Sequence, residues 1–153
     1  MKHKLTIIIL VVLAAVSLFE TRAQDKRWLS YEPATVELQG RLIVQWKYGP
    51  PNFGEQPKTD QRVKVPILVL TKPVNVRGTP GDAHNAISVE GAKRIQLTFA
   101  NVGTDYKGLI GKDVVVRGTL FHAFSGHHYT DVVMDASSIE LKQRGRTGAA
   151  HHR

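Results

Sequence analysis

The sequence predicts an all-β domain, and three observations support this fold class. Short segments with alternating apolar and polar residues recur along the chain, as in half-buried strands. Clusters of glycine and proline separate these segments and predict turns. No segment of useful length has the apolar spacing of an amphipathic helix.

The first predicted strand covers residues 35–44. Apolar residues at every second position share one face, and Gly40 lies in the middle of that face. A glycine inside a strand often marks a sharp bend at a barrel corner. We therefore expect this strand to bend and to take part in two sheets.

Two further strands are predicted in the middle of the chain. Residues 63–70 are almost continuously apolar, and Pro66 favours an edge position or a bulge because proline lacks a backbone donor. Residues 73–76 extend this strand past a kink. Residues 94–99 alternate again and form the third strand. Long loops with glycine and proline precede the second and third strands, at residues 46–62 and 78–91.

The last part of the domain predicts a β-hairpin. Residues 113–121 form its first strand, with Gly118 on the apolar face, and residues 129–135 form its second. Ile139 and Leu141 close the domain. The glycine-containing connection before the hairpin, residues 101–112, has room for one helical turn.

These elements predict an OB-like fold, a small five-stranded and partly open Greek-key barrel. Two of the five strands are bent at a glycine, and a short helix fits between the third and the fourth. A small β-sandwich is the alternative, because periodicity alone does not distinguish the two folds.

The chain contains five separated segments in this order: YEPATVELQGRL, GPPNFGEQPKTD, PVNVRGTPGD, KRIQL and GKDVVVRGTLFHAFSGHHYTDVVMD. Together they resemble an exported bacterial family known only as a domain of unknown function, DUF4431. The resemblance covers most of residues 31–141. It implies a bacterial envelope or periplasmic setting and supports the barrel, but it implies no activity, because the family has none assigned.

The N-terminal residues predict a Sec-type signal peptide. A short basic region at residues 2–4 precedes an apolar run at residues 5–19, which is too short to span a bilayer comfortably. Small residues follow, so we expect cleavage after Ala23 and a periplasmic or secreted protein. An uncleaved membrane anchor is the alternative. The chain has no cysteine, which excludes disulfides and a lipoprotein.

The predicted domain is almost neutral. Of the formal net charge of +8, the leader (residues 1–23) carries +2 and a tail expected to be disordered (residues 142–153) carries +4. Residues 24–141 therefore keep only +2, which argues against a nucleic-acid partner. We expect the mature chain to be a monomer without a transmembrane segment.

The hairpin predicts one candidate metal site. A three-residue turn at residues 124–126 would pair His122 with His128 across the strands, with Cβ atoms about 4.5–5.5 Å apart. Two imidazoles at that spacing could bind one zinc, copper or nickel ion, with His84 or Asp82 as a third ligand. The alternative is that both histidines cap the barrel end, because a zinc site usually needs three or four protein ligands.

A candidate ligand face lies beside the first long loop and the hairpin turn. Aromatic and basic side chains are interleaved there, which suits a sugar, an anionic glycan or a peptide, and OB-like folds bind ligands between the corresponding loops. The candidate residues are Trp46, Tyr48, Phe53, Arg62, Phe121 and Tyr129. The alternative is that these aromatic side chains cover a barrel end, because aromatic residues more often pack than bind.

The sequence contains no Gly-x-Ser-x-Gly, His-Glu-x-x-His or P-loop pattern. We therefore expect a non-enzymatic binding module whose ligand is an envelope glycan, a peptide or a partner protein. One alternative is a metal-binding protein or metal-dependent enzyme centred on the histidine pair. The other is a structural interaction protein of the envelope.

Overall fold

The computed structural model describes residues 28–100 and 105–143, so the predicted signal peptide and most of the tail lie outside the described residues. No helix in the described part is long and apolar enough to cross a membrane. The described elements are β1 (Trp28–Ser30), β2 (Thr35–Tyr48), β3 (Arg62–Arg77), β4 (Val89–Thr98), the 3-10 helix η2 (Lys107–Leu109), β5 (Asp113–His122) and β6 (Val132–Leu141).

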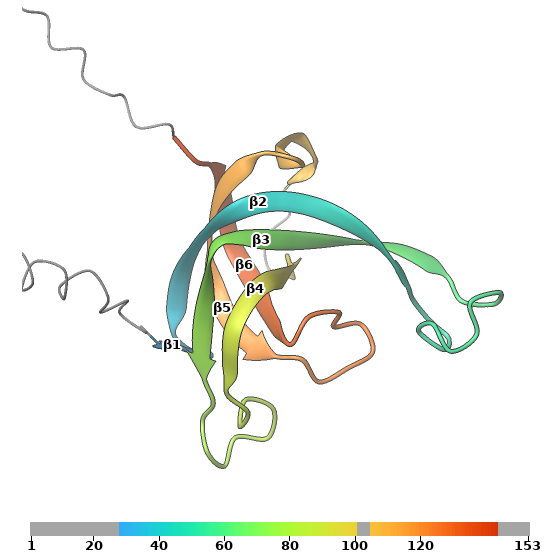
Figure 1. Ribbon diagram of the computed structural model, residues 1–153, viewed down its shortest axis with the longest axis horizontal. Coiled ribbons are helices and arrows are strands. Elements are labelled where there is room, and N and C mark those ends of the chain that lie inside the picture. The colour runs from blue at the N-terminus through green and yellow to red at the C-terminus, as the bar shows by residue number, and fades with distance from the viewer. Residues whose placement is uncertain (1–27, 101–104, 144–153) are drawn as a thin grey trace, which may run out of the picture.

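The strands form one sheet that closes on itself (Figure 1). Its order is β1-β3-β2-β5-β6-β4, and an additional pairing of β3 with β4 completes the ring. The pairs are antiparallel except for β1–β3 and β4–β6. Five strands close the ring, and η2 lies between the third and the fourth of them. This arrangement confirms the OB-like prediction over the two separate sheets of a sandwich.

Gly40 and Gly118 bring their strands unusually close to the neighbouring strands. A Cβ atom at Gly40 would collide with the backbone oxygen of Val69, and one at Gly118 would collide with that of Asp135. Only glycine fits at such points of close approach. Figure 1 shows β2 as one long arch, as expected for a strand bent at Gly40.

The inside of the ring is the apolar core. Alternate residues of the strands point inward and are almost fully buried, and burial contributes about 1.5–3 kcal/mol for each large apolar side chain. The most completely buried members include Leu42, Leu68, Val76, Ile95, Val114, Val116, Leu120 and Met134.

β2 and β3 are longer than the sequence predicted. β2 continues to Tyr48 and β3 begins at Arg62, so the two strands form a hairpin that extends beyond the ring (Figure 1). The pairing of β3 with β4 begins only at Ile67, so Pro66 has a strand on one side alone. Its predicted edge position is confirmed.

Two strand segments were not predicted from the sequence. β1 has only three residues, too few to show a periodicity, and it pairs in parallel with the end of β3. β4 begins at Val89, five residues earlier than expected. Gly91 has a positive φ of 67° there, and the register against β3 is irregular, which explains why residues 89–93 lack a clear alternation.

The register predicted for the last hairpin is wrong by four residues. His122 pairs with Val132 and Leu120 with Met134, so the connecting loop covers residues 123–131. Because the shift is an even number of residues, Val132 and Met134 still face the core. The predicted cross-strand pair of His122 and His128 does not form.

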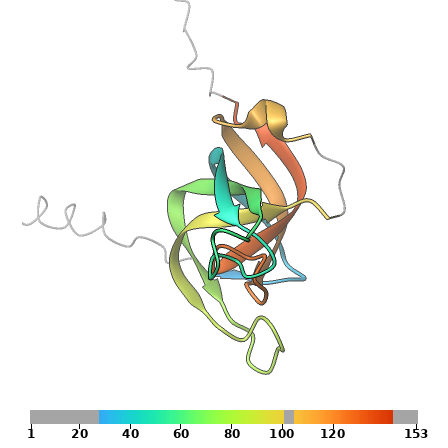
Figure 2. The ribbon, with the colours of Figure 1, turned by 90° about the vertical axis from the view of Figure 1, so that its right-hand side faces the viewer.

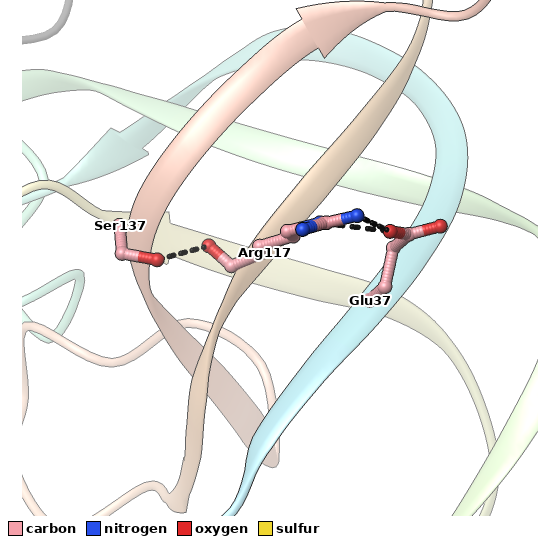
Figure 3. Close-up of polar contacts among 3 residues, drawn as sticks. All are labelled: Glu37, Arg117 and Ser137. Atoms are coloured by element: carbon pink, nitrogen blue, oxygen red, sulfur yellow. Dashed lines mark hydrogen bonds and ion pairs between the residues drawn. The ribbon is translucent and has the colours of Figure 1, made fainter.

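A β-bulge lies in the same hairpin. Arg117 pairs with Ser138 and Gly118 with Ala136, which leaves Ser137 as the extra residue. The Ser137 hydroxyl donates to the backbone oxygen of Arg117 at 3.2 Å, and the Arg117 guanidinium forms an ion pair with Glu37 of β2 at 2.8 Å (Figure 3). Both charged groups are exposed, so the pair contributes at most about 1 kcal/mol.

Candidate functional site

Three loops lie beside the ring: residues 49–61, residues 78–88 and residues 123–131. The third lies between the other two, because Phe53 contacts His127 and His84 contacts Phe124. In Figure 2 the tip of the β2–β3 hairpin faces the viewer, and its loop lies in front of the loop between β5 and β6.

The conformation of loop 49–61 depends on Asp60. Its buried carboxylate accepts hydrogen bonds from the backbone N–H groups of Asn52, Gly54 and Gln56 at 2.9, 2.7 and 3.3 Å, and from the Asn52 side chain at 3.2 Å. Burial acts to raise the pKa of Asp60, but these hydrogen bonds outweigh it and lower the pKa below its usual value. Asp60 therefore shapes the loop and has no oxygen left over for a ligand.

Loop 49–61 packs directly against loop 123–131. The rings of Phe53 and His127 meet edge to face with centroids 4.9 Å apart, and the Phe53 ring also lies against Gly126. The Tyr129 hydroxyl donates to the backbone oxygen of Tyr48 at 2.8 Å. Burial raises the pKa of that hydroxyl. The two loops that were expected to flank an open ligand face thus contact each other.

Loop 123–131 also covers part of the outer face of the ring. Ile67, Gln96 and Val133 are register partners on that face, yet they are only 0%, 7% and 0% exposed. The Gln96 side chain accepts a hydrogen bond from the Tyr129 N–H at 2.7 Å and donates one to the His127 oxygen at 2.9 Å. Its side-chain amide thereby clamps the loop over the face that OB-like folds often use for ligands.

The structure places His122 at the end of β5, beside loop 78–88. Its backbone N–H donates to the side-chain oxygen of buried Asn85 at 2.9 Å. Its ring nitrogen Nδ1 lies 2.9 Å from the Ala123 oxygen, and its ring meets Tyr31 edge to face at 6.3 Å. These contacts match the capping role more closely than a ligand role.

His128 lies in a separate aromatic cluster. Its Nδ1 accepts a hydrogen bond from the Phe124 N–H at 3.1 Å, and its ring lies 5.2 Å from Phe121 and 4.6 Å from Phe124. Burial, and then the nearby charge of His127, lower the pKa of His128. The neutral ring is therefore the favoured form, with Nδ1 already used as an acceptor.

The two predicted third ligands are engaged elsewhere. The Asp82 carboxylate accepts the backbone N–H groups of Asn85 and His84 at 2.7 and 2.9 Å, which lowers its pKa. The His84 ring lies against Phe124, with centroids 4.6 Å apart. Within residues 28–100 and 105–143, no group of three or more histidine and acidic side chains could hold a metal ion.

The structure does not bring the six predicted ligand residues together in one site. Tyr48, Phe53 and Tyr129 take part in the contact between the two loops, and Phe121 belongs to the cluster around His128. Trp46 lies on the hairpin beyond the ring and is 55% exposed. Arg62 lies over the Tyr48 ring, with its guanidinium carbon 4.5 Å from the ring centroid.

The sequence did not identify Lys64 as part of this surface. Its amine lies 5.0 Å from the centroid of the Trp46 ring, and the two residues are register partners. Residues 46–62 were expected to form a loop, which hid the pairing. The alternation of polar and aromatic residues through Trp46 and Tyr48 is the signal that could have extended the strand.

A comparison with protein-family models gives a match over the last part of the domain. Residues 94–140 match the model of a family described as Domain of unknown function (DUF4431). The matched range runs from within β4 to the end region of β6 and includes Gln96 and loop 123–131. Comparisons with curated proteins and with solved structures found no match. The resemblance predicted for residues 31–141 is thus supported over residues 94–140, which are similar to the DUF4431 family.

Proposed function

We propose that this chain is an exported, non-enzymatic binding module of the bacterial envelope. The predicted signal peptide and the resemblance to an exported family support the location. The observation that carries the binding role is the exposed face of the β2–β3 hairpin beyond the ring. Two aromatic side chains of β2 lie there, each beside a cation of β3: Trp46 with Lys64, and Tyr48 with Arg62.

Packing within the described part of the chain does not account for the exposed position of Trp46. At Leu42 and Leu68 the same face of the two strands lies in the core, with both side chains 0% exposed. Four residues further along β2, on the same face, Trp46 is 55% exposed. An exposed tryptophan beside cations is a common composition of binding surfaces. A ligand or partner that covers Trp46 would account for the length of the hairpin.

Co-sedimentation of the purified protein with an isolated bacterial envelope fraction tests the proposal. We expect saturable binding that falls at least tenfold in Trp46→Ala and in Lys64→Ala. Arg77→Ala is the matched control, because Arg77 lies 5.1 Å from the Trp28 ring in a similar pair elsewhere on the sheet. Binding that is absent, or equal in all variants, would rule out this surface.

Export has its own test, which is N-terminal sequencing of the protein from fractionated cells. A cleaved leader predicts a periplasmic or secreted product that begins at Gln24. Recovery of a chain with an intact leader in the membrane fraction would instead favour the uncleaved anchor.

A further inference from the structure

We infer that the exposed hairpin face recognises a linear anionic polysaccharide, a glycan chain whose sugars carry carboxylates. The inference rests on the binding role proposed above and names the ligand class of the same surface. Three register pairs make up this face: Val44 with Pro66, Trp46 with Lys64, and Tyr48 with Arg62.

The charge of the face favours an anionic ligand. Of its six side chains, two are cations and none is acidic. Neither Lys64 nor Arg62 forms an ion pair with any residue of the described part; each lies over an aromatic ring instead. A cation over an exposed ring is held only weakly and can turn toward a carboxylate at little cost.

The arrangement of the rings favours a sugar over a peptide. An extended peptide adds to a sheet through backbone hydrogen bonds along a strand edge, whereas this surface is a strand face made of side chains. The flat indole of Trp46 suits the apolar face of a pyranose ring. Successive pairs lie two residues apart, about 6.8 Å along the strands, so the two cations can contact charges on neighbouring sugars of one chain.

The other polyanions fit less well. Single-stranded nucleic acid needs a positively charged groove that follows many phosphates, and residues 24–141 carry a net charge of only +2. A neutral glycan would use the aromatic rings but would leave both cations without a role. An anionic glycan uses the ring and the cation of each pair together.

Fluorescence titration of the full chain with Trp28→Phe, which leaves Trp46 as the reporter, tests the inference. The probes are hexagalacturonate and hexamannuronate, each beside its methyl-esterified, uncharged form, and a poly-glutamate peptide of equal charge. We expect saturable binding of at least one oligouronate. We also expect at least tenfold weaker binding of the ester and of the peptide, and affinity that falls as salt rises.

The variants separate this inference from the proposed function. Lys64→Gln and Arg62→Gln should each weaken oligouronate binding at least tenfold, while Arg77→Gln should leave it unchanged. Equal binding of the ester or of poly-glutamate would overturn the inference. So would failure of both oligouronates to bind while envelope sedimentation still depends on Trp46, and in that case the binding role would survive. Loss of both signals would remove the binding role as well.

Discussion

Replacement of Gln96 by leucine should release loop 123–131 from the outer face of the ring. Gln96 is 7% exposed, and its side chain satisfies the Tyr129 N–H and the His127 oxygen. Leucine has a similar volume, so it creates no cavity. The change therefore isolates the two hydrogen bonds from the packing around them.

The expected magnitude follows from the groups left without partners. An unsatisfied buried donor or acceptor costs about 1–3 kcal/mol, and Gln96→Leu leaves one of each. Tyr129 is only half-buried and His127 is exposed, so water can reach the loop backbone once it loosens. We therefore expect the free energy of unfolding to fall by about 2–3 kcal/mol, at the lower end of the summed range.

Urea unfolding and hydrogen exchange measure the two consequences. Gln39→Leu is the matched control, because Gln39 is an exposed strand glutamine and its replacement should stay within about 0.5 kcal/mol. The Tyr129 amide should exchange faster in Gln96→Leu only. If Gln96→Leu is as stable as the control and the Tyr129 amide keeps its protection, the two Gln96 side-chain hydrogen bonds do not hold loop 123–131 on the ring.

Three further predictions concern the fold and its loops. Gly118→Ala should lower the free energy of unfolding by more than about 2 kcal/mol, because its Cβ atom would overlap the Asp135 oxygen. The control is Gly108→Ala, which has open space around it and should change the free energy of unfolding by no more than about 0.5 kcal/mol. Urea unfolding midpoints measure both changes. The pKa of Asp60 is lowered in the folded chain, so its contribution to stability is complete above the usual pKa of 3.8 and is lost as the pH falls through the lower folded pKa. The thermal midpoints of wild type and Asp60→Asn should therefore converge in acid. The pKa of His128 is also lowered. The hydrogen bond from the Phe124 N–H to its neutral ring is therefore intact above the usual pKa of 6.5 and is lost as the pH falls through the lower folded pKa. After correction for intrinsic exchange, protection of the Phe124 amide should drop over that window and should not change with pH in His128→Gln.

The ring could be predicted because its strands carry local signals. The alternation around Gly40 and around Gly118 marks a core face interrupted by a glycine, and both glycines lie where no Cβ atom fits. The extension of β2 to Tyr48 was not predicted, because residues 46–62 were interpreted as a loop although polar and aromatic residues still alternate through Tyr48. Trp46 is exposed on the face that is buried at Leu42.

The register predicted for the β5–β6 hairpin was wrong because an apolar periodicity of two does not distinguish registers that differ by an even number of residues. A shift by two or four residues keeps the same side chains in the core, so Val132 and Met134 satisfy both registers. The short turn at residues 124–126 had a favourable sequence, but the tertiary contacts of Gln96 with residues 127–130 favour the longer loop. Those contacts join residues more than 30 positions apart, and no local pattern shows them.

The same contacts decide where a ligand can bind. An OB-like fold offers the outer face between its two long loops, but here Gln96 and Tyr129 fix one loop over that face and Phe53 packs the other loop against it. A ligand at that face would first have to break these contacts. The face of the hairpin that carries Trp46 and Lys64 needs no such rearrangement, because it is already exposed and its cation is held only by a ring. Binding at the hairpin should therefore be insensitive to Gln96→Leu, whereas binding between the loops should strengthen when the clamp is lost.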